Sequence, residues 1–483
     1  MQTSLLRWSF VDTKFTSSLI EGPIPLRLLN FALPMLYTNA LLSLNALINS
    51  IWVGHFLGET ALTAVANGNL LLFLVLAASF GIPAAAAILV SQALGSHRVS
   101  LAKSIVRTGI VFFALLAITV TVIGLIVTRP LMAAMHTPNE SLPMAVTYTR
   151  VIFLALPSIY IYYFLSNILP AAGDSRTPFY FSLLAVATDT TLNPVLIFGV
   201  GPLRPLGVAG SALATMIAQT ISLVMLVYHL RRRQHQLEFR VRELMTSRLD
   251  FSVLRFLLRK GIPMGAQLFL LSLSGVVMGT LVNRFGVITA AAFSASLQLW
   301  NYLQMPMAAL SVAVSAMAAQ SVGAQRGDRV DAIAWAGILQ AVLITSLLVI
   351  MFEAISTHIY GLFLPSKSLS LTVGGHINRI VSPSYILFSA SIVLFAAVRS
   401  VGVVVPQLVI LAVEVLGVRL PFAIALLPKW QADAIWWSYP ISFAVTAGLT
   451  SLYYVYGDWR SMRVLDALEC RTTAGSDGKR HSR

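Results

Sequence analysis

Long apolar segments separated by short polar ones fill the chain from residue 27 to residue 457. Each apolar segment reaches the roughly 20 residues that a helix needs to cross a bilayer. Only one long polar stretch, residues 231–251, interrupts the pattern. We therefore predict an all-α integral membrane protein with twelve transmembrane helices, six on each side of this stretch. The predicted spans are 28–53, 61–92, 104–128, 145–170, 178–200, 207–230, 255–284, 288–320, 331–355, 378–400, 403–427 and 434–456.

Composition supports this class and removes others. The 483 residues are 57% hydrophobic and 11% charged, whereas soluble proteins carry about 25% charged residues. The single cysteine, Cys470, excludes a disulfide within the chain, and the eight histidines lack zinc-site spacing. The first 25 residues show no signal-peptide pattern. We expect no cofactor, and no metal other than sodium as a coupling ion. Prolines inside predicted spans, namely Pro34, Pro83 and Pro306, predict helix kinks.

Basic residues give an orientation. Most of the 33 Lys and Arg fall on the side that holds both termini and the polar stretch. The loops on the other side hold a minority, namely Arg129, Arg150, Arg204, Arg284, Lys367, Arg379 and Lys429. The positive-inside rule then places both termini in the cytoplasm of a multi-pass protein of the cell (inner or plasma) membrane. The net charge of +15 is thus a signal of topology, and we expect no nucleic-acid partner.

The polar stretch divides the chain into predicted domains. These are a cytoplasmic arm (1–26), an N-terminal lobe of six spans (27–230), a basic cytoplasmic linker (231–253), a C-terminal lobe of six spans (254–457) and a cytoplasmic tail (458–483). Within the linker, the spacing of Leu237, Val241, Leu244 and Met245 is typical of a basic amphipathic helix on anionic lipid. A solvated linker with no further role is the alternative, and both remain open.

The two lobes share an internal repeat. Several pairs of identical residues are separated by 228 positions, and the basic loop after each Gln-x-x-Gly lies on the same predicted side. The pairs are Gln92 and Gln320, Gly95 and Gly323, Gly58 and Gly286, and Pro178 and Pro406. This predicts a parallel repeat, with two pseudo-symmetric lobes about an axis along the membrane normal. Two such lobes enclose a central cavity, which favours transport over catalysis.

Polar residues inside the spans are candidates for function, because they are costly in a bilayer. Asp189 and Asn193 lie one helical turn apart, as do Asn45 and Asn49, and Thr215 lies in the sixth predicted span. Their oxygens together could bind sodium, or the carboxyl group could exchange a proton, since burial favours its neutral form. Alternatively, these groups only hydrogen-bond the helices to one another.

Other in-span acids have simpler predicted roles. Glu353 is close enough to the end of its span to reach the interface. Glu414 precedes Arg419 by five residues, so the two could form an ion pair, although this spacing does not align side chains on an α-helix.

The fourth predicted span offers a candidate surface for substrate. Tyr160, Tyr163 and Asn167 lie in it, and aromatic faces attract organic cations. We include these residues and Asn45 as candidate cavity residues. Packing or an interfacial aromatic belt is the alternative.

Ordered motifs across nearly the whole chain resemble the multidrug and toxin extrusion (MATE) family. They are LP…NSIWVGHFLG (33–58), SQALG (91–95), AAGDSRTPF (171–179), LNPVLIFGVGP…GVAGSALAT (192–215), GIP (261–263), AAQSVGAQRGD (319–328) and VRLP (418–421). The resemblance implies twelve helices around a V-shaped cavity. It also implies export of drugs or metabolites, often cationic, against inward protons or sodium.

The chain departs from the family pattern in its first lobe. The family usually carries an aspartate where this chain has Asn49, and the usual order Asn-x-x-x-Asp-Pro is exchanged here to Asp189, Asn193 and Pro194. Thr215 matches the sixth-span threonine. The second-lobe acids of the sodium-dependent branch correspond to Leu271 and Phe388, so the N-lobe-coupled (DinF-like) branch is the better match.

These observations favour a secondary antiporter, not an enzyme, that acts as a monomer on small molecules within the lipid bilayer. A lipid-linked sugar flippase of a related superfamily is the alternative, which a cationic cavity would support. An enzyme would need a cluster of intramembrane histidines or paired acids, and the sequence offers none.

Overall fold

The computed structural model describes residues 19–135, 137–199, 204–239, 243, 250–363 and 369–461, and the elements assigned in them are helices. The first half contains α1 (Ile24–Leu57), α2 (Glu59–Ser79), α3 (Gly81–Gly95), α4 (Val99–Ala134), α5 (Leu142–Ala171), α6 (Arg176–Phe198) and α7 (Val208–Arg232). The second half contains α9 (Phe251–Asn283), α10 (Val287–Gly323), α11 (Gly327–Ala354), α12 (Ser356–Phe363), α13 (Leu369–Val381), α14 (Tyr385–Ser400), α15 (Val405–Ala412), α16 (Leu420–Trp430) and α17 (Ala432–Tyr456). Short η segments cover Ser382–Ser384, Val413–Arg419 and Asp458–Ser461.

The helices account for twelve spans. Eleven in the described part are long and apolar enough to cross a membrane, and α17, with 25 residues, completes the set. The second predicted span, 61–92, is divided at Phe80 into α2 and α3. Pro83 then lies in the first turn of α3, where a missing N–H breaks no helical bond. The tenth begins at Leu369 and not at residue 378, because polar residues in α13 hide its start from the hydropathy pattern.

Helix α4 shows how the spans meet their surroundings. It exposes a row of large apolar side chains and buries small or hydroxyl-bearing residues, among them Thr121, Gly124 and Thr128. The exposed row contains Leu115, Ile118, Val122, Ile123 and Ile126. Outward apolar faces of this kind are stable against lipid and not against water.

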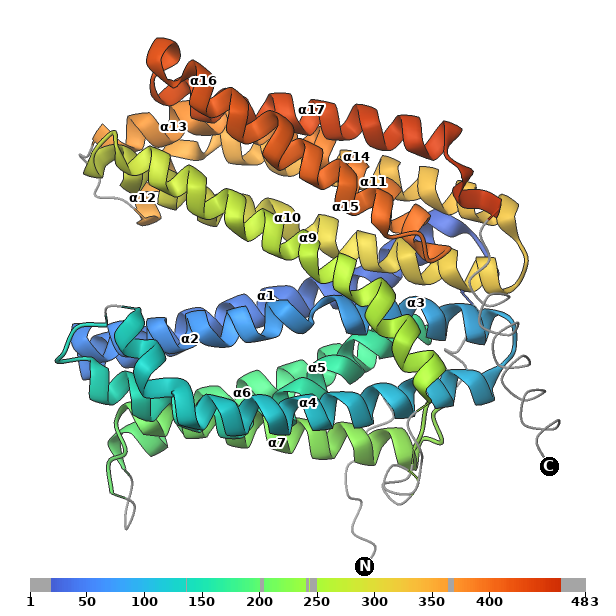
Figure 1. Cartoon of the computed structure of the whole chain (residues 1–483), viewed down its shortest axis with the longest axis horizontal. Helices are drawn as coiled ribbons and strands as arrows, with labels where there is room; N and C mark the ends of the chain where they lie inside the picture. Colours follow the sequence, from blue (N-terminus) through green and yellow to red (C-terminus); the bar gives the residue numbers. More distant parts are fainter. Residues whose placement is uncertain are drawn as a thin grey trace, which may run out of the picture.

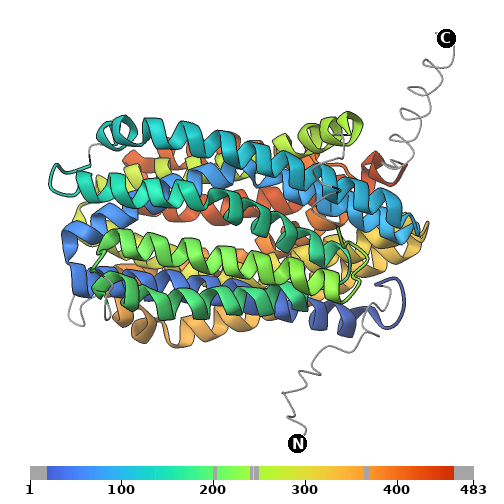
Figure 2. The same ribbon diagram turned by 90° about the horizontal axis from the view of Figure 1, so that it is seen from below.

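The two halves diverge from a point of contact near α3 and the start of α9 (Figure 1). Within the first half, the long helices run side by side along the length of the molecule (Figure 2). The first helix of each half begins against the other half. Leu28 and Phe31 of α1 pack in the core formed by α10, α11 and α14, and Val253 and Leu257 of α9 pack in the core of α3, α4 and α5.

The halves approach to backbone distance where α3 and α10 end, which we call the crossed end. A Cβ on Gly95 would overlap the carbonyl oxygen of Gln320, and a Cβ on Gly323 would overlap that of Gln92. Each glutamine also donates across the contact. Gln92 Nε2 lies 2.6 Å from the Ser400 oxygen, and Gln320 Nε2 lies 2.9 Å from the Ala171 oxygen. We call the opposite end, which contains Gly58 and Gly286, the open end.

The repeat seen in the sequence is also a repeat of the backbone. Gly58 and Gly286 have φ of 84° and 90°. His97 and Gln325, each in the loop after a Gln-x-x-Gly, both have a φ of 59°. Such φ values are uncommon for residues other than glycine, so their recurrence at the same offset confirms the parallel repeat of two related halves.

Some predictions concern residues outside the described part. The arm at 1–18, the tail at 462–483 and most of the predicted amphipathic helix, including Val241, Leu244 and Met245, lie there. Helix α1 runs through Pro34 without interruption. Pro34 cannot donate to the Asn30 carbonyl one turn earlier, so this remains the predicted place for α1 to bend.

We expect Gly95→Ala to lower the free energy of unfolding by about 1–3 kcal/mol, since the added methyl group must displace backbone across the crossed end. Gly279→Ala is the matched control, because nothing lies within 4 Å of a Cβ there. It should leave stability unchanged or raise it by up to about 1 kcal/mol through helix propensity. Denaturation midpoints in micelles test this, and equal effects of the two substitutions would contradict the assigned contact.

Candidate functional site

The buried acid Asp189 lies on α6, whose start is fixed by its own sequence. Asp174 accepts hydrogen bonds at its Oδ1 from the N–H groups of Arg176 and Thr177, at 3.2 and 2.9 Å. This side chain caps the free N–H groups of the first turn. From there the helix carries Asp189 inward, where the side chain is only 2% exposed.

Four side chains from three helices surround the carboxylate of Asp189. Asn45 and Asn49 of α1 donate to Oδ2 at 3.0 and 2.8 Å. Thr215 of α7 donates to Oδ1 at 3.1 Å, and Asn193 of α6 lies 3.4 Å from the same oxygen. Asn193 also donates to Asn49 Oδ1 at 2.8 Å. The structure therefore brings together all five residues that the sequence suggested for an ion site.

The surroundings of Asp189 contain no counter-ion. No ion pair among the described residues includes this carboxylate, whose hydrogen-bond partners are amides and a hydroxyl. The donors stabilise the ionised form, while burial favours the neutral form. Such an acid is balanced between two states, and the binding of a proton or a cation can decide between them.

Oxygen atoms near Asp189 fit a hard cation. The amide oxygens of Asn45 and Asn193 are buried and have no hydrogen-bond partner among the described residues. Carboxylate and amide oxygens are the ligands that hard cations prefer. The carboxamides of Asn45 and Asn49 can also rotate to exchange N–H for oxygen. The same residues could thus bind either the bare carboxylate or a cation next to it.

A cavity of about 650 Å³ lies between the two halves, where α1 faces α10. Carboxamide and hydroxyl groups share its lining with apolar side chains, and none of its lining residues is charged. From α1 it is lined by Asn39, Leu42, Ser43, Ala46, Leu47 and Ser50, and from α10 by Gln298, Asn301, Tyr302, Gln304, Met305 and Ala308. Its size is within the range of small-molecule sites.

Helix α1 separates this cavity from the acid. Ala46 and Ser50 face the cavity, whereas Asn45 and Asn49, one position before each of them, contact Asp189. Adjacent positions on a helix point to different faces. A movement of α1 that follows the state of Asp189 therefore also changes the cavity wall.

The aromatic residues proposed for the cavity lie elsewhere. Tyr160 is 1% exposed, and its hydroxyl bonds to Ser79 and to the Val75 carbonyl within the first half. Asn167 donates to the carbonyl of Tyr163. Neither these three residues nor Asn45 is among the residues that line the cavity between α1 and α10. For Tyr160, core packing explains the position.

Sequence reasoning missed the cavity residues themselves. The signal was present as polar side chains in two spans, with Asn39, Ser43 and Ser50 in the first and Gln298 and Asn301 in the eighth. Polar residues on one helix face of a span mark a surface that avoids lipid. The pattern did not reveal that these two faces meet.

Glu414 and Arg419 form the ion pair that the sequence suggested. The α-helical objection to their spacing does not apply, because residues Val413–Arg419 adopt a π-helix. The π-helix closes i→i+5 hydrogen bonds, so residues five apart lie one turn above each other. Both side chains are buried, at 0% and 5% exposure.

Twelve spans in two related halves, with an uncharged cavity between them, define a membrane transporter. A protein-family model described as MatE matches residues 34–195 and 263–425, one block in each half. The chain belongs to this family, whose members are transporters and not enzymes.

Individual relatives support this family membership. The chain is 33% identical over 436 residues to the probable multidrug resistance protein YoeA of Bacillus subtilis (strain 168), covering 90% of this chain and 94% of the relative. It is 27% identical to the probable multidrug resistance protein YpnP of the same organism, covering 92% and 98%. A crystal structure of MATE in the bent conformation superimposes with a TM-score of 0.83 at 19% identity, covering 95% of this chain and 99% of the other. This last match confirms the twelve-helix fold.

We expect Asn49→Asp to make stability depend on pH. The new carboxylate would lie about 3 Å from Asp189, and two such groups cannot both ionise cheaply. The folded protein would hold a proton that the unfolded chain releases above about pH 4. Stability should therefore fall as pH rises from about 5 to about 9, and sodium should restore it.

The control for this prediction is Asn49→Ala, which loses the hydrogen bond without adding a charge. Unfolding midpoints across the pH range provide the measurement. Parallel pH profiles for Asn49→Asp and Asn49→Ala would show that position 49 is not next to an ionisable acid.

Proposed function

We propose that this protein is a secondary active antiporter that exports small organic compounds, often cationic, in exchange for protons or sodium. The observation that carries the proposal is the contact of α1 with two sites at once. One face of α1 binds the isolated acid Asp189 through Asn45 and Asn49, and the neighbouring face lines the cavity between the halves. The multidrug resistance relatives support export of drugs or metabolites.

The coupling follows from the charge of one carboxyl group. When Asp189 is ionised, the amides of Asn45 and Asn49 are held as donors and α1 is drawn toward α6. A proton on Oδ2 removes an acceptor, and a sodium ion requires amide oxygens in place of N–H groups. Each form favours a different position of α1, so ion binding shifts the equilibrium between cavity shapes.

Pro34 gives α1 a place to bend during this change. Its ring prevents one bond of the helix, and Thr38 Oγ1 donates to the Pro34 carbonyl at 2.9 Å. The start of α1, as far as Leu36, packs in the core of the second half, and its end, at Val53 and Leu57, packs in the first half. A bend at this position lets the cavity wall move while the start of the helix remains fixed.

The orientation of the cycle rests on the positive-inside rule. The basic loops that follow Gly95 and Gly323 lie at the crossed end, which we place at the cytoplasm of the cell membrane, together with both termini. The open end then faces outward. The two halves of one chain complete the cavity, so a monomer suffices for transport.

The cavity lining favours this function over the transfer of lipid-linked sugars. A lipid pyrophosphate is anionic, and none of the residues lining the cavity is cationic. Arg419, the in-span cation noted in the sequence, is neutralised by Glu414. The position of the lone acid in the first half, with Leu271 and Phe388 in the second, supports the N-lobe-coupled (DinF-like) branch.

We expect Asp189→Asn to abolish ion-driven efflux in proteoliposomes while the protein still folds, because a carboxamide can neither take up a proton nor balance a cation. Asp433→Asn is the matched control, since this acid is half-exposed and pairs with His376 at 2.8 Å far from the cavity. Transport of cationic dyes under imposed proton or sodium gradients provides the measurement. Efflux that is equal in the two variants would contradict the assignment.

A further inference from the structure

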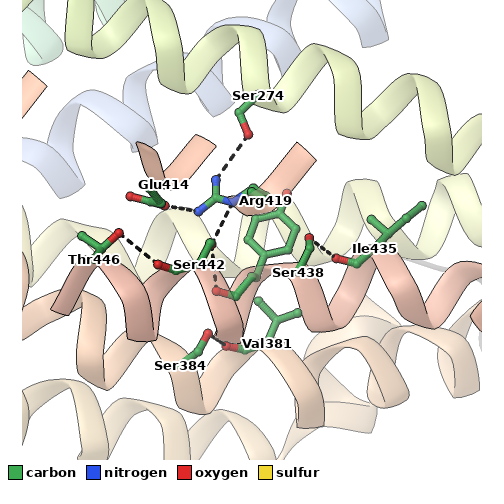
Figure 3. A network of polar contacts seen from close by, with 10 residues as sticks. Ser274, Val381, Ser384, Glu414, Arg419, Ile435, Ser438, Ser442 and Thr446 are labelled. Atoms are coloured by element: carbon green, nitrogen blue, oxygen red, sulfur yellow. Dashed lines mark hydrogen bonds and ion pairs between the residues drawn. The ribbon is translucent and has the colours of Figure 1, made fainter. Parts of the chain in front are cut away.

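A second buried acid lies in the second half, within the network drawn in Figure 3. Arg419 bridges three elements there. Its Nη2 pairs with Glu414, its Nη1 lies 3.3 Å from Ser274 Oγ of α9, and its Nε lies 3.1 Å from Ser442 Oγ of α17. The guanidinium also lies over the ring of Tyr439, at 4.6 Å from its centroid. These contacts engage all three nitrogens of a planar, permanently charged group.

The repeat relates this network to the Asp189 site. Pro34 and Pro263 align α1 with α9, and the same offset of 229 residues aligns Asn45 with Ser274. Pro178 and Pro406 align α6 with the helix formed by α15, the π-turn and α16. Each half therefore has a buried carboxylate on its fifth span, and the offset of 228 places Glu414 opposite Val186, about one helical turn before Asp189. In the first half the carboxylate itself contacts the first and sixth spans, whereas in the second half Arg419, the partner of Glu414, makes these contacts.

The two sites differ in what balances the charge. Around Asp189 the partners are amides and a hydroxyl, which carry no net charge. Around Glu414 the partner is a guanidinium on the next turn of the same helix. The π-helix at Val413–Arg419 makes this possible, since an α-helix would turn the two side chains away from each other.

We propose that the Glu414–Arg419 pair is a second copy of the ion site, in which the guanidinium permanently occupies the place that a coupling cation takes next to Asp189. The inference rests on the proposed function. It adds that the second half does not respond to protons or sodium, so one ion site, in the first half, drives each transport cycle. Arg419 is thus the residue that prevents the second half from binding a coupling ion, and so limits each cycle to the one ion site in the first half.

The environment of the pair supports permanent charge neutrality. The ionisable groups that face it are Tyr385 of α14 and Tyr439 of α17, and both are phenols that remain neutral at physiological pH. Helix α9 contributes the uncharged Ser274. Glu414 Oε2 is buried and has no partner among the described residues. This oxygen would accept a proton or a cation if the guanidinium were removed.

The test is site-resolved labelling of buried carboxyl groups in the full-length protein, using a lipid-soluble carbodiimide followed by mass spectrometry. The reagent attacks protonated carboxyl groups. We expect ion-sensitive labelling of Asp189 and no labelling of Glu414. In Arg419→Met, Glu414 should become reactive at acidic pH and be protected by raised pH or by sodium. Glu414 that is labelled in the unaltered chain and protected by raised pH or by sodium would overturn the proposal.

A second variant covers the outcome in which Arg419→Met does not fold. Glu414→Gln combined with Arg419→Met removes both charges and leaves no unpaired ion in the bilayer. Efflux in this double variant should keep the pH and sodium dependence of the unaltered chain, and the number of ions moved per substrate should remain the same. A change in that number would overturn the proposal.

The readouts separate this inference from the proposed function. If Asp189 shows no ion-sensitive labelling and Glu414 shows none, the assignment of Asp189 fails while the neutral pair stands. If Asp189 responds and Glu414 responds as well, the coupling function stands and the inference fails.

Discussion

The structure depends on a reciprocal contact between two glycines and two glutamines. Gly95 admits the backbone of Gln320, and Gly323 admits that of Gln92, so the two halves approach to backbone distance at the crossed end. They do so again where Gly81 of α3 meets Gly261 of α9. The glutamine side chains cross the same contact to carbonyl groups of the opposite half. The cavity between α1 and α10 lies between the same two halves. Because no charged group takes part, the contact can separate without exposing an unpaired ion.

Each half buries one carboxylate on its fifth span within the bilayer, and the two halves stabilise that carboxylate differently. A carboxylate removed from water must be hydrogen-bonded, paired or neutralised. Asp189 is hydrogen-bonded by neutral groups, and in the proposed cycle this leaves its charge free to be balanced by a proton or a cation. Glu414 is paired with Arg419, so its charge is already balanced. In the proposed cycle the two related sites therefore have different roles. Asp189 binds the coupling ion, and the Glu414–Arg419 pair stabilises its half.

Much of the fold could be predicted from the sequence because lipid leaves little freedom. The length of the apolar segments predicts the spans, and the recurrence of Gln92 and Gln320 at a fixed offset predicts the repeat. The residues around Asp189 were predicted from helical spacing and family motifs. The π-helix at Val413–Arg419 could not be predicted, because a change from i+4 to i+5 hydrogen bonds does not alter the pattern of apolar residues. The packing of the starts of α1 and α9 on the opposite half could not be predicted either, because the residue pattern of one helix does not show which half it packs against.

The most direct test of the account is a measurement of distances between spin labels at both ends of the molecule. One pair would replace the exposed His97 and Gln325 at the crossed end, and the other Glu59 and Val287 at the open end. The account predicts that acid pH or sodium changes the two distances in opposite directions, and that Asp189→Asn removes the response. Distances that do not change with either ion, or that still change in Asp189→Asn, would contradict control of the two halves by this carboxylate.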